Sequence, residues 1–382
     1  MIRTESKRGR LALMVAHCAG MVDLVALPLW VGTLISQYRF DPQQAGLLAT
    51  LFLAGAVLAS VLAAPRFHRL SGRLVATLGF AASAAAFALA AGSTAFGTLA
   101  LLHALGGMAT GAALSMTHGT IARSARPHRL FAMAGAALGV FAVIFYAVVP
   151  QALASAGGTA LFAAFAIVMG VAALAALLAF PSPEAMPHAE RAAARLTTPV
   201  WCGIAGISCM ALVQAMTFSF LERVGNDRGF AVAAVGGVLV ALALVNLLPA
   251  PLAALLERRW RARSVLLVGP VLQALLTAVI MNATAFAAYA AAASVFAAVV
   301  IFAHTFAFGL LARLEPSGRA LAATPAMMMA GAAVGPLLGG TIVKAAGYGS
   351  LAVAAAALSA VAVFCFSRLP TPAQSTAQEA LA

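Results

Sequence analysis

Charged residues are scarce in this chain of 382 residues, because Asp, Glu, Lys and Arg together make up only 9% of it. Ten of these residues are acidic and 23 are basic. A soluble protein of this length needs a charged surface, and so few charges could not cover one. Apolar residues make up 63% of the chain and the mean hydropathy is +1.01. This composition predicts a polytopic membrane protein.

Cysteine is also rare, and none of the four cysteines belongs to a C-x-x-C pair. This argues against a disulfide framework and a zinc centre, so we expect no metal and no cofactor. The chain lacks G-x-S-x-G and H-E-x-x-H strings and a soluble catalytic domain, which argues against an enzyme. The net charge is +13, but the basic residues occur in small clusters that are separated by apolar stretches of about 20 residues. No continuous basic face for nucleic acid is therefore expected.

Twelve apolar stretches are each long enough to cross a bilayer, which takes about 20 residues. Their length and lack of strict alternation favour helices over a β-barrel, so the predicted fold class is all-α. The first stretch is too long for the core of a cleaved signal peptide and is expected to remain as a span. The predicted spans are residues 11–36, 44–64, 74–92, 96–121, 130–150, 158–180, 198–221, 231–256, 264–282, 284–311, 320–345 and 348–367.

The basic residues are divided unevenly between the two ends of these spans. If the N-terminus is cytoplasmic, 19 bases lie in the cytoplasmic segments and four lie on the other side. Arg66, Arg69 and Arg73 belong to the larger group. Positive residues are enriched in cytoplasmic loops, so both termini are predicted to be cytoplasmic. Two Lys against 21 Arg, with abundant Ala, suggests a bacterium of high genomic GC content, and we expect the bacterial inner membrane.

The chain divides into two related halves. Residues 181–197 are the longest polar stretch and carry three prolines, which is typical of a linker. They separate residues 1–180 from residues 198–382, with six spans in each. At an offset of 190 residues, Phe40 corresponds to Phe230 and Arg73 to Arg263. The pattern predicts two six-helix repeats around a central cavity, with a substrate site near the midplane.

With twelve spans, a central linker and sided charges, the chain resembles members of the major facilitator superfamily over essentially its whole length. The family carries the signature G-x-x-x-D-R-x-G-R-R between its second and third spans. Here Gly72 and Arg73 match the end of that signature, while Arg69 replaces its acid and Pro65 its first glycine. The resemblance implies a cytoplasmic gate formed by Arg69, Gly72 and Arg73 in the first half. In the second half it implies Glu257, Arg258 and Arg261.

Glycines in the eleventh span form a second point of resemblance. The string GAAVGPLLGG is similar to the core that drug:proton antiporters of this family carry in their fifth span, although the fifth span here has Val140 in place of the proline. Gly331, Gly335 and Gly339 are four residues apart, so a neighbouring helix can approach them closely. Gly107 and Gly111 in the fourth span are interpreted in the same way.

Asp23 is the candidate proton-coupling residue, because it lies at the centre of the first predicted span. An ionised carboxylate at the bilayer centre costs roughly 2.5–3.5 kcal/mol on insertion scales. Asp23 must therefore face a water-filled cavity or carry a proton. His17 is six residues away and does not share its face of a helix. Glu222 and Arg223 end the seventh predicted span and are expected at the interface.

Five further polar residues in the spans are predicted substrate contacts. They are Gln214, His304, His118, Asn246 and Tyr146. Gln273 is ranked below them, because the resemblance places its span at the periphery. An anionic substrate usually needs an Arg or Lys within the membrane, and the sequence has none near the middle of a predicted span. This favours a neutral or cationic substrate.

Taken together, these features predict a proton-coupled secondary transporter of a small organic molecule. The expected partners are the substrate, protons and lipid, and a monomer is expected. The resemblance to the drug and sugar efflux branch favours export. Two alternatives remain open: a proton-coupled importer of an organic or aromatic acid, and a membrane sensor that does not transport.

Overall fold

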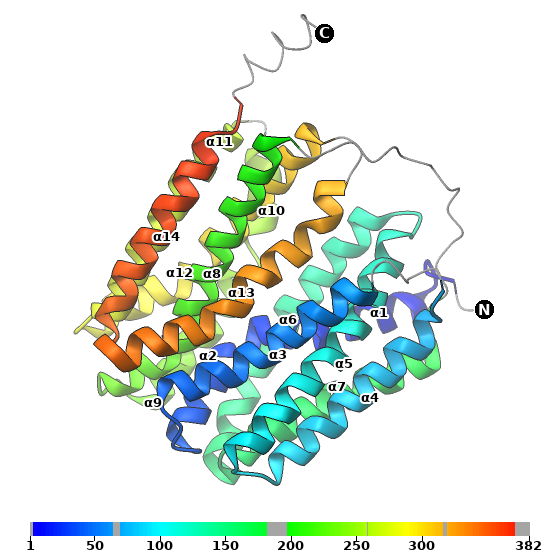
Figure 1. The fold of residues 1–382 in the computed structure, drawn as a ribbon, viewed down its shortest axis with the longest axis horizontal. Helices are drawn as coiled ribbons and strands as arrows, with labels where there is room; N and C mark the ends of the chain where they lie inside the picture. Colours follow the sequence, from blue (N-terminus) through cyan, green and yellow to red (C-terminus); the bar gives the residue numbers. More distant parts are fainter. Residues whose placement is uncertain (1–2, 64–68, 182–196, 258, 316–318, 371–382) are drawn as a thin grey trace, which may run out of the picture.

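The computed structural model of the chain describes residues 3–63, 69–181, 197–257, 259–315 and 319–370. Arg258, most of the predicted linker and Pro65 lie outside these ranges. Fourteen α-helices build the described part (Figure 1). They are α1 (Lys7–Gly20), α2 (Val22–Ser36), α3 (Pro42–Ala63), α4 (Gly72–Ala91), α5 (Phe96–Ala122), α6 (Pro127–Ala156), α7 (Thr159–Ala179), α8 (Thr198–Asp227), α9 (Val232–Val245), α10 (Pro249–Leu256), α11 (Ala262–Asn282), α12 (Phe286–Leu314), α13 (Arg319–Ala346) and α14 (Gly349–Ser367).

Within the described ranges, twelve segments are long and apolar enough to cross a membrane, which confirms the predicted all-helical class and number of spans. Two predicted spans are each built from two helices: α1 and α2 form span 1, and α9 and α10 form span 8. The sequence analysis was wrong to expect these as single helices. Span 7 also continues to Asp227, six residues beyond its predicted end. The chain ends of the described part lie on one side, called the terminal side below; the opposite side is called the far side.

The break in span 1 occurs at Met21, where φ is −109° and ψ is 22°. Gly20 precedes it, and a side chain there would overlap with Leu114 of α5. Pro28 lies inside α2 and has no N–H to donate to the preceding turn. Because α2 restarts at Val22, Asp23 falls in the first turn of a helix rather than in the middle of one.

Equivalent residues of the two halves make equivalent contacts. The Arg73 guanidinium donates to the carbonyl oxygen of Leu177 at 2.9 Å, and that of Arg263 donates to the carbonyl of Ser367 at 2.8 Å. Both partners follow their arginine by 104 residues. Aromatic pairs repeat as well: Phe40–Phe96 and Phe230–Phe286 have ring centroids 5.6 and 5.5 Å apart. The offset of 190 residues seen in the sequence therefore relates equivalent places in space.

Glycines set how closely the helices pack, as predicted. A methyl group at Gly107 or Gly111 of α5 would overlap with the backbone of α3. Gly331, Gly335 and Gly339 of α13 lie against α8 in the same way. Without a Cβ, two helix backbones can approach each other closely.

The two halves meet on the far side of the molecule. Figure 1 shows α3 and α13 side by side there, and the bundles diverge toward the terminal side. Gly46 of α3 abuts the Pro336 carbonyl, and Gly340 of α13 abuts the Pro42 carbonyl. Lys344 and Asp41 form an ion pair of 2.9 Å across this boundary. The segments α1 and α10, which form the terminal-side parts of spans 1 and 8, pack chiefly within their own halves. The far side is therefore closed.

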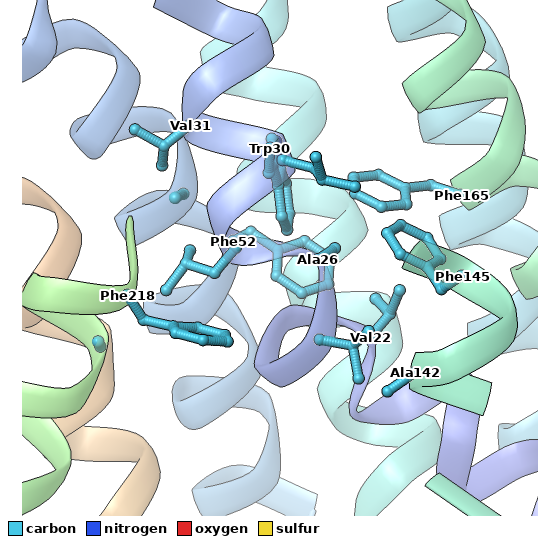
Figure 2. Packing of buried hydrophobic residues seen from close by; sticks show 14 of the residues in the cluster. Val22, Ala26, Trp30, Val31, Phe52, Ala142, Phe145, Phe165 and Phe218 are labelled. Carbon is cyan, nitrogen blue, oxygen red and sulfur yellow. The ribbon is translucent and has the colours of Figure 1, made fainter. Parts of the chain in front are cut away.

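The packing around α2 holds that helix rigidly. Val22, Ala26 and Trp30 are spaced by four and share one face, which Figure 2 shows packed toward Phe145 and Phe165. The Trp30 side chain is fully buried, and its ring centroid lies 4.7 Å from that of Phe165. Its indole N–H donates to His103 Nε2 at 3.2 Å. This core fixes the position of Asp23.

Candidate functional site

Asp23 lies in the first turn of α2, and its side chain is buried. A helix start leaves its first N–H groups without intrahelical partners, although the N–H of Leu24 donates to the carbonyl of Met21 at 3.2 Å. A helix N-terminus also favours a negative charge. The break in span 1 thus gives this carboxyl group a polar setting within the membrane.

Tyr146 of α6 lies next to this turn. Its hydroxyl group donates a hydrogen bond to the carbonyl of Val25, and its side chain is buried. The sequence analysis placed Tyr146 among the substrate contacts. In the structure its hydroxyl is instead committed to the backbone of α2, where it supports the turn that carries Asp23.

His118, another predicted contact, pairs with His17. Nδ1 of His17 lies 3.0 Å from Nε2 of His118, so one ring donates an N–H to the other. The ring of Phe131 packs edge-on against His118 at 5.7 Å. Sequence reasoning compared His17 only with Asp23 on its own span and missed this pair. The signal in the sequence that could have revealed the pair was a histidine in each of two spans that pack together.

The other three predicted contacts all lie in the second half and have unsatisfied polar atoms. Within the described part of the chain, Oε1 of Gln214, Oδ1 of Asn246 and Nε2 of His304 are buried and have no hydrogen-bond partner. A buried polar atom without a partner costs about 1–3 kcal/mol. Asn246 follows the last residue of α9, at the break in span 8. A bound molecule that donates hydrogen bonds would satisfy the two amide oxygens, and also Nε2 of His304 in the tautomer that carries its proton on Nδ1.

Asp23 and Gln214 lie at similar depths on neighbouring helices. Both α2 and α8 run toward the far side, where Gly32 abuts the carboxyl group of Glu222. Asp23 precedes Gly32 by nine residues and Gln214 precedes Glu222 by eight. At 1.5 Å per residue these separations are roughly 13 and 12 Å. The proton-binding candidate therefore lies level with a substrate-binding candidate across the boundary between the halves.

Glu222, expected at the membrane interface, packs against the other half of the protein. Because α8 continues to Asp227, Glu222 lies inside the helix, and its carboxyl group lies against Gly32 of the other half. Its Oε1 accepts a hydrogen bond from the Asn226 side chain, while Oε2 is buried without a partner in the described residues. A second buried acid therefore lies nearer the far side than Asp23.

Gln273, which the sequence analysis ranked lower, joins two helices of the second half. Its side-chain Nε2 donates to the carbonyl oxygen of Met210 at 3.0 Å. This hydrogen bond ties α11 to α8.

The predicted gate residues lie at the terminal side, and their observed contacts stay within one half. Gly72 begins α4 after Ser71, whose hydroxyl accepts from the N–H of Leu74. Arg73 binds the last carbonyls of α7, and Arg69 is exposed. In the second half, Glu257 pairs with Arg313 at 3.2 Å. Arg261 precedes the first residue of α11. A gating role for these loops remains a prediction.

Solved structures share this fold at low sequence identity. A bacterial homologue of the human lysosomal transporter Spinster, in an inward-facing and occupied conformation, matches with a TM-score of 0.72 and 16% identity over 95% of each chain. The nucleoside transporter NupG matches with a TM-score of 0.71 and 16% identity, over 95% of this chain and 98% of its own. A variant of NupG gives 0.74 and 15%, over 95% and 100%.

A comparison with curated proteins gives no match. The model of the Major Facilitator Superfamily matches residues 12–317, which is well over half of the chain. This protein, a multi-pass membrane protein with a transporter fold, therefore belongs to the Major Facilitator Superfamily.

Proposed function

We propose that this protein is a proton-coupled secondary transporter that exports a small organic molecule by alternating access. The observation that carries the proposal is the position of Asp23, a buried carboxyl group at a break in span 1 and level with Gln214. Half-helix ends at the midplane are characteristic substrate and ion sites of secondary transporters. Asp23 would bind the coupling proton there.

The unpaired atoms of Gln214, Asn246 and His304 suggest the class of substrate. The oxygens of Gln214 and Asn246 are hydrogen-bond acceptors, and Nε2 of His304 accepts when its proton is on Nδ1. They lie on α8, at the end of α9 and on α12, with His304 nearest the terminal side. A substrate with N–H or O–H donors and no negative charge fits them. NupG is a nucleoside transporter, so nucleosides, which carry such donors, belong in the first screen.

Sidedness comes from the distribution of basic residues. Since 19 of the 23 bases lie at the terminal side of the predicted topology, we infer that this side is cytoplasmic. The closed far side would then be external, and the arrangement inward-facing. Reporter fusions test this inference: those after Thr94 or Ala156 should report an external location, and one after Ser71 a cytoplasmic location. A cytoplasmic report after Ala156 would overturn it.

The experiment that tests the function uses purified protein in liposomes with an imposed pH gradient. Neutral and cationic donors, including nucleosides, are first screened for binding by thermal stabilisation. A ligand found in this way should then move against its own gradient, with protons moving in the opposite direction. The proposal fails if the ligand moves only down its gradient whatever the pH difference. Co-transport in the same direction as protons would favour the importer instead.

A further inference from the structure

A groove of about 760 Å³ lies on the membrane-facing surface of the second half. Its walls come from spans 8 and 9 and its floor from span 10. Almost all of its lining is apolar, and Leu248, Leu252 and Val268 are 62%, 47% and 61% exposed. Such residues on a transmembrane bundle face lipid, so the groove is open to the bilayer.

The sequence explains why the second half has room for this groove. In the first half, Gly107 and Gly111 let the backbone of span 2 lie directly against span 4. Their equivalents in the second half are Ala297 and Ile301, whose side chains prevent the same approach. In addition, span 2 is one unbroken helix, whereas span 8 breaks before Pro249. The inner part of span 8 therefore leaves space beside span 9.

The terminal-side mouth of the groove carries positive charge. Trp260 and Arg261 line it, and both are exposed at the start of α11. Arg261 occupies the capping position of α11 without a side-chain hydrogen bond to the first N–H groups. Those N–H groups and the helix dipole favour an anion. The nearby acid, Glu257, is paired with Arg313 at 3.2 Å.

Tryptophan and arginine at this level of a membrane protein mark the boundary between hydrocarbon and headgroups. The Trp260 ring packs edge-on against Phe302, with centroids 5.7 Å apart, and so closes one wall of the groove below the mouth. The site thus combines an apolar trough with a cationic end at the membrane surface. That combination matches the two parts of a phospholipid.

We propose that this groove binds one phospholipid with an anionic headgroup. An acyl chain lies between α10 and α11, and the phosphate lies at Arg261 and the first N–H groups of α11. The occupant is a membrane lipid rather than free phosphate, because the apolar trough accounts for nearly all of the lining. The proposal does not depend on the transported substrate or on the coupling ion.

Trp260 itself can report the lipid, and the chain offers a matched control. Trp201 is 57% exposed near the start of α8, also at the terminal side, whereas Trp30 is fully buried in the first half. The variants Trp201→Phe and Trp260→Phe therefore each leave one lipid-exposed tryptophan. Each variant is placed in phosphatidylcholine bilayers that contain a fixed fraction of brominated phosphatidylglycerol or brominated phosphatidylcholine. Bromine quenches tryptophan on contact, so quenching measures which lipid lies beside the ring.

At Trp260, brominated phosphatidylglycerol should compete about five-fold better than brominated phosphatidylcholine, the preference expected from one arginine near the surface. At Trp201 the two lipids should quench equally. Arg261→Gln in the Trp201→Phe background should remove the preference, and so should high salt. Equal quenching by both lipids at Trp260 would show that bulk lipid fills the groove, and absence of quenching would show that lipid does not enter. Either result overturns the proposal.

Discussion

Lys344 and Asp41 form an ion pair that joins the two halves on the far side, with Nζ 2.9 Å from Oδ2. Lys344 lies near the end of α13, and Asp41 immediately precedes α3. Lys344 also donates to Oε1 of Gln43 at 3.3 Å. The pair can exist only while the far side is closed, so it contributes to the balance between the two transport conformations.

Breaking this pair should open the far side slightly. Lys344→Gln is expected to shift the equilibrium toward the open far side by no more than about five-fold, because exposed ion pairs contribute about 0.2–1 kcal/mol. Spin labels at Thr94→Cys and Thr284→Cys, two equivalent exposed positions, would measure the change in a background without the native cysteines. The reversed pair Asp41→Lys with Lys344→Asp should restore the original distribution, and a failure to do so would point to a local effect.

The same pair predicts a pH dependence. Partial burial raises the pKa of Asp41, but the N–H of Gln44 and the ammonium of Lys344 outweigh this, so the pKa lies below its usual value. Stabilisation of the closed far side is therefore complete above about pH 4, the ordinary range of an aspartate, and is lost as the pH falls through the lowered pKa. The label distances should stay constant from pH 8 to pH 5 and lengthen below pH 4. Lys344→Gln should be less sensitive to acid.

Gly46 and Gly236 offer a comparison between equivalent positions. A methyl group at Gly46 would overlap with the Pro336 carbonyl in the other half, whereas one at Gly236 meets open space. Because a backbone atom cannot move aside as a side chain can, Gly46→Ala should hold the far side open and slow transport at least ten-fold. Gly236→Ala should leave both unchanged. Equal effects of the two variants on label distance would contradict the observed packing.

Asp23→Asn should separate coupling from exchange. The variant removes a costly charge and should insert and fold. Trp30, which belongs to α2, is packed in the core and keeps the helix in place. The variant should not drive substrate against a gradient, although exchange without a gradient should continue. The pH dependence of substrate binding should also flatten, while Asp23→Glu should retain partial coupling. Active transport by the Asn variant at the original rate would make Asp23 a structural residue and direct attention to Glu222.

Glu222→Gln should favour closure of the far side. An ionised Glu222 would place an unpaired oxygen against Gly32, and burial of an unpaired charge is costly. Arg223, the neighbouring cation, is itself paired with Asp227 at 2.7 Å. The neutral amide avoids that cost, so the labels at positions 94 and 284 should report a larger closed population at high pH. An unchanged distribution from pH 6 to pH 9 in both proteins would contradict this role.

Much of the architecture follows from the sequence alone, because the bilayer restricts what a chain can do. Long apolar runs must become helices, so the number of spans could be counted. Glycines at four-residue spacing must lie where helices approach each other, and Gly107 and Gly331 do so. The offset between the halves also located equivalent contacts such as those of Arg73 and Arg263.

Only the tertiary structure decided which polar groups are free. His118 and Tyr146 looked like Gln214 in the sequence, yet His17 and the Val25 carbonyl already engage them. The break at Met21 was also hidden, because a helix tolerates the local sequence and packing against α5 and α6 determines where it ends. Hydrogen bonds between distant segments depend on distances that residue order does not contain. Sequence therefore determined the helices and their number, and packing decided which of their polar side chains remain available for a ligand.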